Sequence, residues 1–77
     1  MTAKEMFEKL GYELIHNIEY QMLYYNSRYD TYIYFYKARK YIEITNEITL
    51  EELQAINKQV KELWGGNNDK WDKRNIR

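Results

Sequence analysis

The pattern of hydrophobic and polar positions divides the chain into a helical segment at each end and an alternating segment between them. The first helix is marked by a capping box, Thr2-Ala3-Lys4-Glu5, with Thr2 as the N-cap and Glu5 at the third helical position. Gly11 follows where a left-handed C-cap favours glycine, so we predict a short helix between these signals. Its apolar positions recur at helical spacing: Ala3, Met6, Phe7 and Leu10.

A second capping box, Thr49-Leu50-Glu51-Glu52, predicts the start of the last helix. Glu51 and Glu52 complement the positive end of its dipole, and Gly65-Gly66 predicts its end. The apolar stripe that we expect to face the core consists of Leu53, Ile56, Val60, Leu63 and Trp64.

Between the helices the spacing changes to alternation, which predicts strands at about 18–25, 30–37 and 40–45, with a short leading piece at 12–15 as an option. Neither intervening turn has the Asn-Gly pattern of a tight hairpin, so the register must come from burial. Pairing Tyr25 with Asp30, and Tyr36 with Tyr41, gathers apolar residues on one face of both hairpins. The predicted inner face is Ile18, Tyr20, Met22, Tyr24, Ile33, Phe35, Ile42 and Ile44.

These elements predict one α+β domain over residues 1–66, a two-layer α-β-β-β-α arrangement. A three-stranded antiparallel meander would carry both helices on one face and leave the other open. Residues 67–77 are polar, and we expect them to form a flexible C-terminal tail. The predicted outer face is Glu19, Gln21, Leu23, Tyr25, Asp30, Tyr32, Tyr34, Tyr36, Tyr41, Glu43 and Thr45.

Composition excludes several classes of site. The 77 residues include no cysteine and one histidine, which leaves no disulfide, thiolate metal site or multi-histidine cluster. The net charge is zero, unlike that of a strongly basic nucleic-acid binder. No apolar run approaches the roughly 20 residues that span a bilayer, so we expect no membrane association. The opening residues lack the basic-then-apolar plan of a signal peptide, so a cytosolic chain is expected.

Catalytic residues are not indicated. His16 is the one side chain that ordinarily titrates near neutral pH, and Ser27 and Thr31 have no identifiable base. Three glutamates near the start of the last helix, Glu47, Glu51 and Glu52, offer a cation site, but capping and dipole complementarity explain them. We therefore predict that the chain is not an enzyme and holds no metal or cofactor.

The nine tyrosines, all between Tyr12 and Tyr41, are the main candidates for a functional surface. The register sends Tyr20 and Tyr24 to the core and leaves Tyr12 and Tyr29 unassigned. Five others share the outer face and are called the tyrosine cluster: Tyr25, Tyr32, Tyr34, Tyr36 and Tyr41. Such rings could simply stiffen a solvated sheet through cross-strand pairs. Alternatively they form a binding surface, which the enrichment of tyrosine at interface hot spots favours.

Basic residues border this surface, because residues 28–42 hold four cations against Asp30 alone. Arg28 and Arg39 join the tyrosine cluster as candidate partner-binding residues. The first hypothesis is docking on a protein partner, either a host factor or a second copy of the chain. The alternative is a single-stranded nucleic acid whose bases stack on the same rings. Glu19, Asp30 and Glu43 on that face weigh against the alternative.

Residues 2–12, Thr2-Ala3-Lys4-Glu5-Met6-Phe7-Glu8-Lys9-Leu10-Gly11-Tyr12, resemble the start of a family of small proteins encoded by phages and prophages of Gram-positive bacteria. Residues 50–63 are similar to the end of that family, and the two segments cover about a third of the chain. The family is functionally uncharacterised, so it transfers no catalytic or binding residue. The resemblance implies a phage accessory protein that works in a bacterial cytoplasm.

Overall fold

The computed structural model describes residues 1–65 and shows two helices and one four-stranded antiparallel sheet. The strands follow one another across the sheet in the order β1-β2-β3-β4. The expectation of three strands is wrong, because the leading piece considered at 12–15 forms a full edge strand. The predicted tail at 67–77 lies outside the described residues. The elements are α1 (Ala3–Lys9), β1 (Glu13–Asn17), β2 (Gln21–Asn26), β3 (Thr31–Tyr36), β4 (Tyr41–Ile44) and α2 (Leu50–Trp64).

Both capping boxes form as the sequence predicts. In α1 the Glu5 amide donates to Thr2 Oγ1 at 3.2 Å, and the Thr2 amide donates to Glu5 Oε1 at 2.8 Å. In α2 the Glu52 amide donates to Thr49 Oγ1 at 3.1 Å, and the Thr49 amide donates to Glu52 Oε1 at 2.6 Å. Gly11, just after α1, has a φ of 95°, so the prediction of a left-handed glycine there is confirmed.

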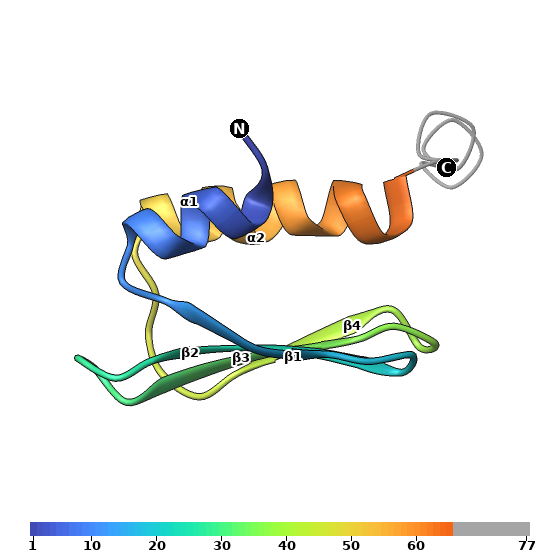
Figure 1. The fold of residues 1–77 in the computed structure, drawn as a ribbon, viewed down its shortest axis with the longest axis horizontal. Helices are drawn as coiled ribbons and strands as arrows, with labels where there is room; N and C mark the ends of the chain where they lie inside the picture. The colour runs from blue at the N-terminus through green and yellow to red at the C-terminus, as the bar shows by residue number, and fades with distance from the viewer. Residues whose placement is uncertain (66–77) are drawn as a thin grey trace.

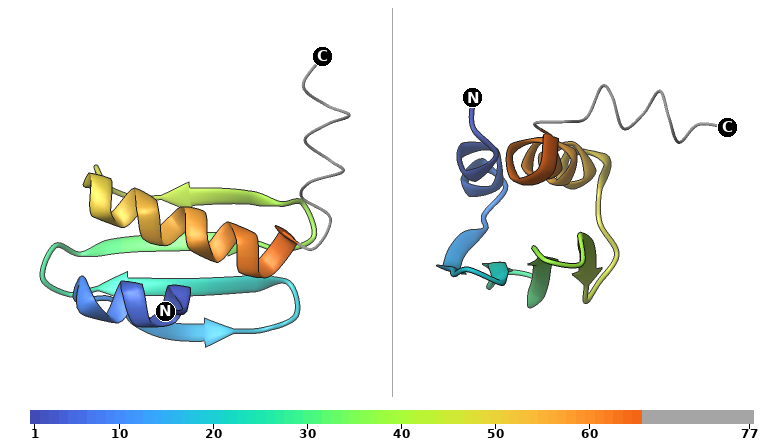
Figure 2. Two further views of the ribbon diagram at one scale, coloured as in Figure 1. Left: turned by 90° about the horizontal axis from the view of Figure 1, so that it is seen from above. Right: turned by 90° about the vertical axis from the view of Figure 1, so that its right-hand side faces the viewer.

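The two helices lie on the same side of the sheet, as the views in Figures 1 and 2 agree. Phe7 of α1 sits at the centre of the core, where its ring stacks on Tyr24 at 4.1 Å and meets the edges of Tyr12 and Phe35. Residues of both helices, of β2 and β3, and Tyr12 before β1 share this one cluster, and the helices leave the opposite face of the sheet uncovered. The buried core consists of Ala3, Phe7, Tyr12, Met22, Tyr24, Ile33, Phe35, Ala55 and Ile56.

The predicted register is right for one hairpin and wrong for the other. Tyr36 pairs with Tyr41 between β3 and β4, as predicted. Between β2 and β3, however, Asn26 pairs with Thr31, a displacement of two residues from the predicted partners. Asp30 has a φ of 54° and belongs to the turn, so it cannot pair in the sheet. A two-residue displacement preserves the alternation of side chains, and the assignment of β2 and β3 residues to faces therefore survives.

Two residues assigned to the inner face, Ile18 and Tyr20, are not in the core. Ile18 is 39% exposed and Tyr20 is 66% exposed. Because β1 runs to Asn17 and β2 begins at Gln21, the residues between them form a reversal, in which the Ile18 amide donates to the Gln21 carbonyl at 2.9 Å. The prediction failed because it extended the second strand through this turn.

The buried face of α2 also differs from the predicted apolar stripe. Leu53 is 42% exposed, whereas the polar Glu52 and Gln59 are buried beside Ala55 and Ile56. Each buried polar side chain receives a hydrogen bond from a core tyrosine: Tyr12 donates to Glu52 Oε2 at 2.7 Å, and Tyr24 donates to Gln59 Oε1 at 2.6 Å. These bonds remove most of the penalty of burying a polar group, so the helix turns a mixed face to the sheet.

Candidate functional site

The tyrosine cluster lies on the face of the sheet that the helices leave open. Tyr25 comes from β2, Tyr41 from β4, and the other three members alternate along β3 with the core residues Ile33 and Phe35. Side chains of a strand point alternately to the two faces, so the burial of Ile33 and Phe35 dictates that the tyrosines between them point outward. The sequence therefore predicts the membership of the cluster correctly, and the structure brings all five side chains to one face.

The five rings form one continuous row. Tyr25 and Tyr32 pair across two strands with centroids 4.5 Å apart, and Tyr36 and Tyr41 do the same at 4.7 Å. Along β3, Tyr34 joins these two pairs, because its ring lies 6.1 Å from that of Tyr32 and 6.0 Å from that of Tyr36. Interplanar angles of 14–17° along the strand show that the three β3 rings are nearly parallel. Aromatic surface therefore runs unbroken over three strands.

Two hydroxyls of the row hydrogen-bond to carboxylates near its ends. Tyr25 donates to Asp30 Oδ1 at 3.1 Å, and Tyr36 donates to Glu43 Oε1 at 2.9 Å. Each hydrogen bond to a carboxylate, followed by the effect of burial, raises the pKa of its tyrosine above the usual 10. Both hydroxyls are held in place, and both carboxylates lie beside this surface.

The outward strand positions around the row are acidic or neutral. Glu13 and His16 face outward from β1, opposite Tyr25 and Leu23 respectively, and a bulge between Leu14 and His16 changes the alternation of the strand. Leu23 is only 8% exposed although it lies outside the core cluster. None of the outward strand residues among those described is lysine or arginine, which gives the face a net negative charge from its carboxylates.

The two arginines predicted to border the cluster lie apart from one another. Arg28 is in the β2–β3 turn and Arg39 is in the β3–β4 turn, so β3 separates them by its full length. The Arg28 guanidinium lies 5.9 Å from the centroid of the Tyr29 ring, outside the row. Both side chains are exposed and remain candidates for the rim of a docking surface.

Other candidate residues from the sequence are engaged in local contacts. His16 Nε2 lies 2.6 Å from Gln21 Oε1, and the Thr31 hydroxyl donates to the Tyr29 carbonyl at 3.4 Å. Within residues 1–65, no three His, Asp or Glu side chains are arranged to hold a metal ion. Glu52, one of the three glutamates that offered a cation site, is bound to Tyr12 and to the Thr49 amide.

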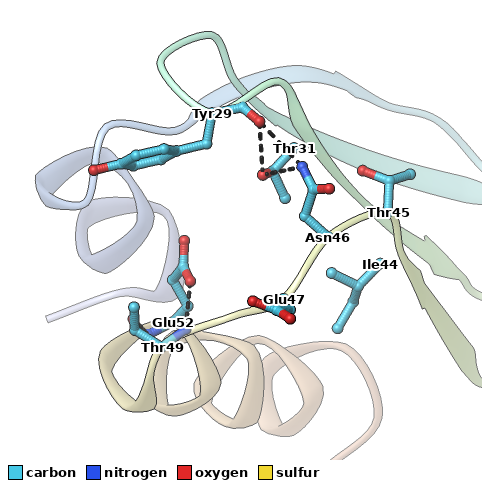
Figure 3. A pocket seen from close by; sticks show the side chains of 8 residues that line it. All are labelled: Tyr29, Thr31, Ile44, Thr45, Asn46, Glu47, Thr49 and Glu52. Atoms are coloured by element: carbon cyan, nitrogen blue, oxygen red, sulfur yellow. Dashed lines mark hydrogen bonds between the residues drawn. The ribbon is translucent and has the colours of Figure 1, made fainter.

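An open groove lies between the start of α2 and the end of the sheet, and Figure 3 shows its walls. The Asn46 amide crosses it and donates to the Tyr29 carbonyl at 3.0 Å and to the Thr31 hydroxyl at 2.9 Å. Three of its polar side chains are engaged within the protein, the Asn46 amide, the Thr31 hydroxyl and the Glu52 carboxylate. It is lined by Tyr29, Thr31, Ile44, Thr45, Asn46, Glu47, Thr49 and Glu52.

Comparisons of the chain with protein-family models, with curated proteins and with solved structures found no match. Neither of the two described helices is long and apolar enough to cross a membrane. The case for a function therefore comes from the surface itself.

Proposed function

We propose that this chain is a non-enzymatic accessory protein of a phage or prophage that binds a protein partner, a host factor or a second copy of itself, through the tyrosine cluster. The observation that carries the proposal is the unbroken row of five rings on the uncovered face of the sheet. Tyrosine offers a partner a large apolar ring and a hydroxyl at a small loss of side-chain entropy.

The row is pre-arranged for binding. Neighbouring rings support one another, and hydrogen bonds to Asp30 and Glu43 fix the hydroxyls of Tyr25 and Tyr36. A partner therefore meets side chains that have already lost much of their conformational freedom, which lowers the entropic cost of association. Arg28 and Arg39, at opposite ends of β3, would contribute at the rim.

The charge of the face favours a protein over a nucleic acid. Stacked rings also accept bases, but Glu13, Asp30 and Glu43 place negative charge beside them. These carboxylates would repel phosphates, and single-strand binders use a positively charged groove to hold the backbone. If the chain bound a labelled oligonucleotide and this binding weakened steeply with added salt, the partner would be a nucleic acid and not a protein.

The test compares tyrosines inside and outside the row. Tyr34→Ser and Tyr36→Ser remove rings from the middle of the cluster, whereas Tyr20→Ser removes a more exposed ring from the β1–β2 turn. Affinity capture from the bacterial host and sedimentation velocity then report partner binding and self-association. We expect the two row variants to lose the partner or the dimer and the turn variant to keep it.

Equal capture and equal sedimentation for all three variants would refute the proposal. Circular dichroism of each variant must show a native spectrum, so that a loss of binding is not a loss of fold.

A further inference from the structure

The row of rings ends in two similar groups, each made of two paired rings and one carboxylate, and we call each group a half-site. The first half-site consists of Tyr25, Tyr32 and Asp30, and the second of Tyr36, Tyr41 and Glu43. The ring centroids are 4.5 Å apart in the first and 4.7 Å apart in the second. In each half-site one tyrosine hydroxyl donates to the carboxylate. Aromatic rings beside a carboxylate attract a cation, because the ring quadrupole and the negative charge act in the same direction.

The two carboxylates are accessible and are not neutralised by a neighbouring side chain. Asp30 and Glu43 are both exposed, and each uses one oxygen to accept from its tyrosine. A carboxylate can accept several hydrogen bonds, so a further donor can share each of them. Among residues 1–65 the one ion pair joins two side chains of α1, in the helix layer on the other side of the sheet. The attraction of both carboxylates is therefore left for a partner.

The distance between the half-sites is set by β3. Tyr32 and Tyr36 are four residues apart on this strand, so the half-sites lie roughly 13 Å apart. Tyr34 lies between them, with its ring nearly parallel to both. An extended segment laid along the row has the same rise per residue, and its residues i and i+4 point to the same side. Cationic side chains four residues apart would therefore reach both half-sites at once.

The same charges distinguish between kinds of partner. If two copies of the chain met through this face, carboxylates of both would lie in one contact, where like charges repel. The phosphates of a nucleic acid would meet the same repulsion. A basic protein segment instead gains from both half-sites. Arg28 and Arg39 lie in the turns beyond the ends of the row, Arg28 over the ring of Tyr29, where they can pair with acidic residues at the margins of such a segment.

We propose that the tyrosine cluster binds an extended, cationic segment of another protein, whose arginine or lysine side chains at positions i and i+4 occupy the two half-sites. The inference rests on the proposed function and selects, from its two kinds of partner, a protein other than a second copy of the chain. Arginine suits the half-sites better than lysine, because its planar guanidinium stacks on a ring while its N–H groups donate to a carboxylate.

Synthetic peptides test the spacing with the whole chain. The probe is a short threonine and serine peptide that carries two arginines four positions apart. Its control has the same composition with the arginines three positions apart, which places them on opposite sides of an extended segment. We expect the probe to bind about fivefold more tightly, because the control brings only one cation to the rings. NMR titration measures both affinities, and the probe should shift the ring signals of Tyr32 and Tyr36 but not the amides of α1.

Two charge variants test the role of the carboxylates. Glu43→Gln keeps an acceptor for the Tyr36 hydroxyl and removes the charge, so it should weaken binding of the probe about fivefold. Glu51→Gln makes an equal change of charge in the first turn of α2, on the other side of the sheet, and should leave the affinity unchanged. Equal weakening by both variants would show that only the net charge matters, and it would overturn the inference.

Equal affinities for the two peptides would also overturn the inference, as would the absence of binding at millimolar probe. Tighter binding of a glutamate version of the probe, or of an oligonucleotide, would assign the face to an acidic partner or a nucleic acid. A dimer that Tyr34→Ser dissociates in sedimentation would assign it to a second copy.

Capture from the bacterial host separates this inference from the proposed function. A partner that is lost with Tyr34→Ser but kept by the double variant Asp30→Asn/Glu43→Gln would overturn the inference and leave the proposed function standing. Capture that none of these variants changes would refute the proposed function. Spacing-dependent binding of the probe in that case would still support the cation-binding chemistry of the half-sites.

Discussion

The Tyr12 hydroxyl donates a 2.7 Å hydrogen bond to Glu52 Oε2, which connects the segment entering the sheet to the first turn of α2, 40 residues later. The other carboxylate oxygen of Glu52 accepts from the Thr49 amide, so one side chain caps a helix and holds the core. Burial first, and then the hydrogen bond to Glu52, raises the pKa of Tyr12 far above its usual value. The contact is a structural one, and it makes a direct prediction about stability.

Tyr12→Phe should lower the free energy of unfolding by about 1.5–3 kcal/mol, because the buried carboxylate loses a donor while the ring packing is kept. Urea unfolding measures the change. Glu52→Gln keeps an acceptor for the Thr49 amide, and it serves as the second arm of a double-mutant cycle. A purely additive cycle would contradict a direct interaction between the two side chains.

Tyr24→Phe should also destabilise the fold, by about 1–3 kcal/mol, because Gln59 would be left buried without its donor. Combining it with Gln59→Met replaces both polar partners by apolar groups and should recover most of the loss. A double variant as unstable as Tyr24→Phe alone would show that the hydrogen bond is not the cause.

Alkaline pH should unfold the protein in a defined window. Burial, together with the charges of Glu62 and Glu8, raises the pKa of Tyr24 to about 12 from a usual value of 10. The folded state thus keeps a proton that the unfolded state releases. The stability that the protonated Tyr24 hydroxyl contributes is fully present below about pH 10. It is lost as pH rises towards 12, and the free energy of unfolding falls by about 1.4 kcal/mol per pH unit for this group. Urea titrations between pH 9 and 12 should show a shallower loss for Tyr24→Phe/Gln59→Met; an unchanged slope would contradict this origin.

Gly11→Ala should destabilise the protein by about 1 kcal/mol or more, because its φ of 95° is costly for a residue with a Cβ. An added Cβ would also lie 3.4 Å from Asn26 Nδ2, which donates to the Leu10 carbonyl. Gly65→Ala is the matched control, since its φ of −81° suits alanine and its substitution should be nearly neutral. Equal effects of the two substitutions on thermal unfolding would contradict the conformational argument.

The geometry of the tyrosine cluster can be checked by titrating ring-labelled tyrosine with NMR. The hydrogen bond to Glu43 raises the pKa of Tyr36, so Glu43→Gln should bring that pKa down towards 10. Asp30→Asn should do the same for Tyr25 and leave Tyr36 unaffected. If neither substitution moves its own tyrosine, the row is not ordered as described.

The helix ends and the members of the tyrosine cluster could be predicted because the sequence patterns that indicate them span only a few neighbouring residues. A capping box is contained within four residues, and Thr2 and Thr49 cap their helices as the sequence indicates. Alternation along 31–36 places three tyrosines of the cluster on the outer face of the sheet. This holds in the predicted register and in the observed one, because the two differ by two residues. The first strand was only an option, because a bulge between Leu14 and His16 interrupts its alternation.

What the sequence by itself determined is therefore local: two capped helices, a glycine turn and the faces of the central strands. Only the tertiary structure decided that Tyr20 belongs to a turn and Tyr12 to the core, and that Glu52 and Gln59 are buried. The physical reason is that burying a polar group depends on its partner, and here the partners lie 35 and 40 residues away. No periodic pattern records such a pairing, whereas alternation alone places the tyrosines of the cluster on one face, and only the observed register sets Tyr25 beside Tyr32.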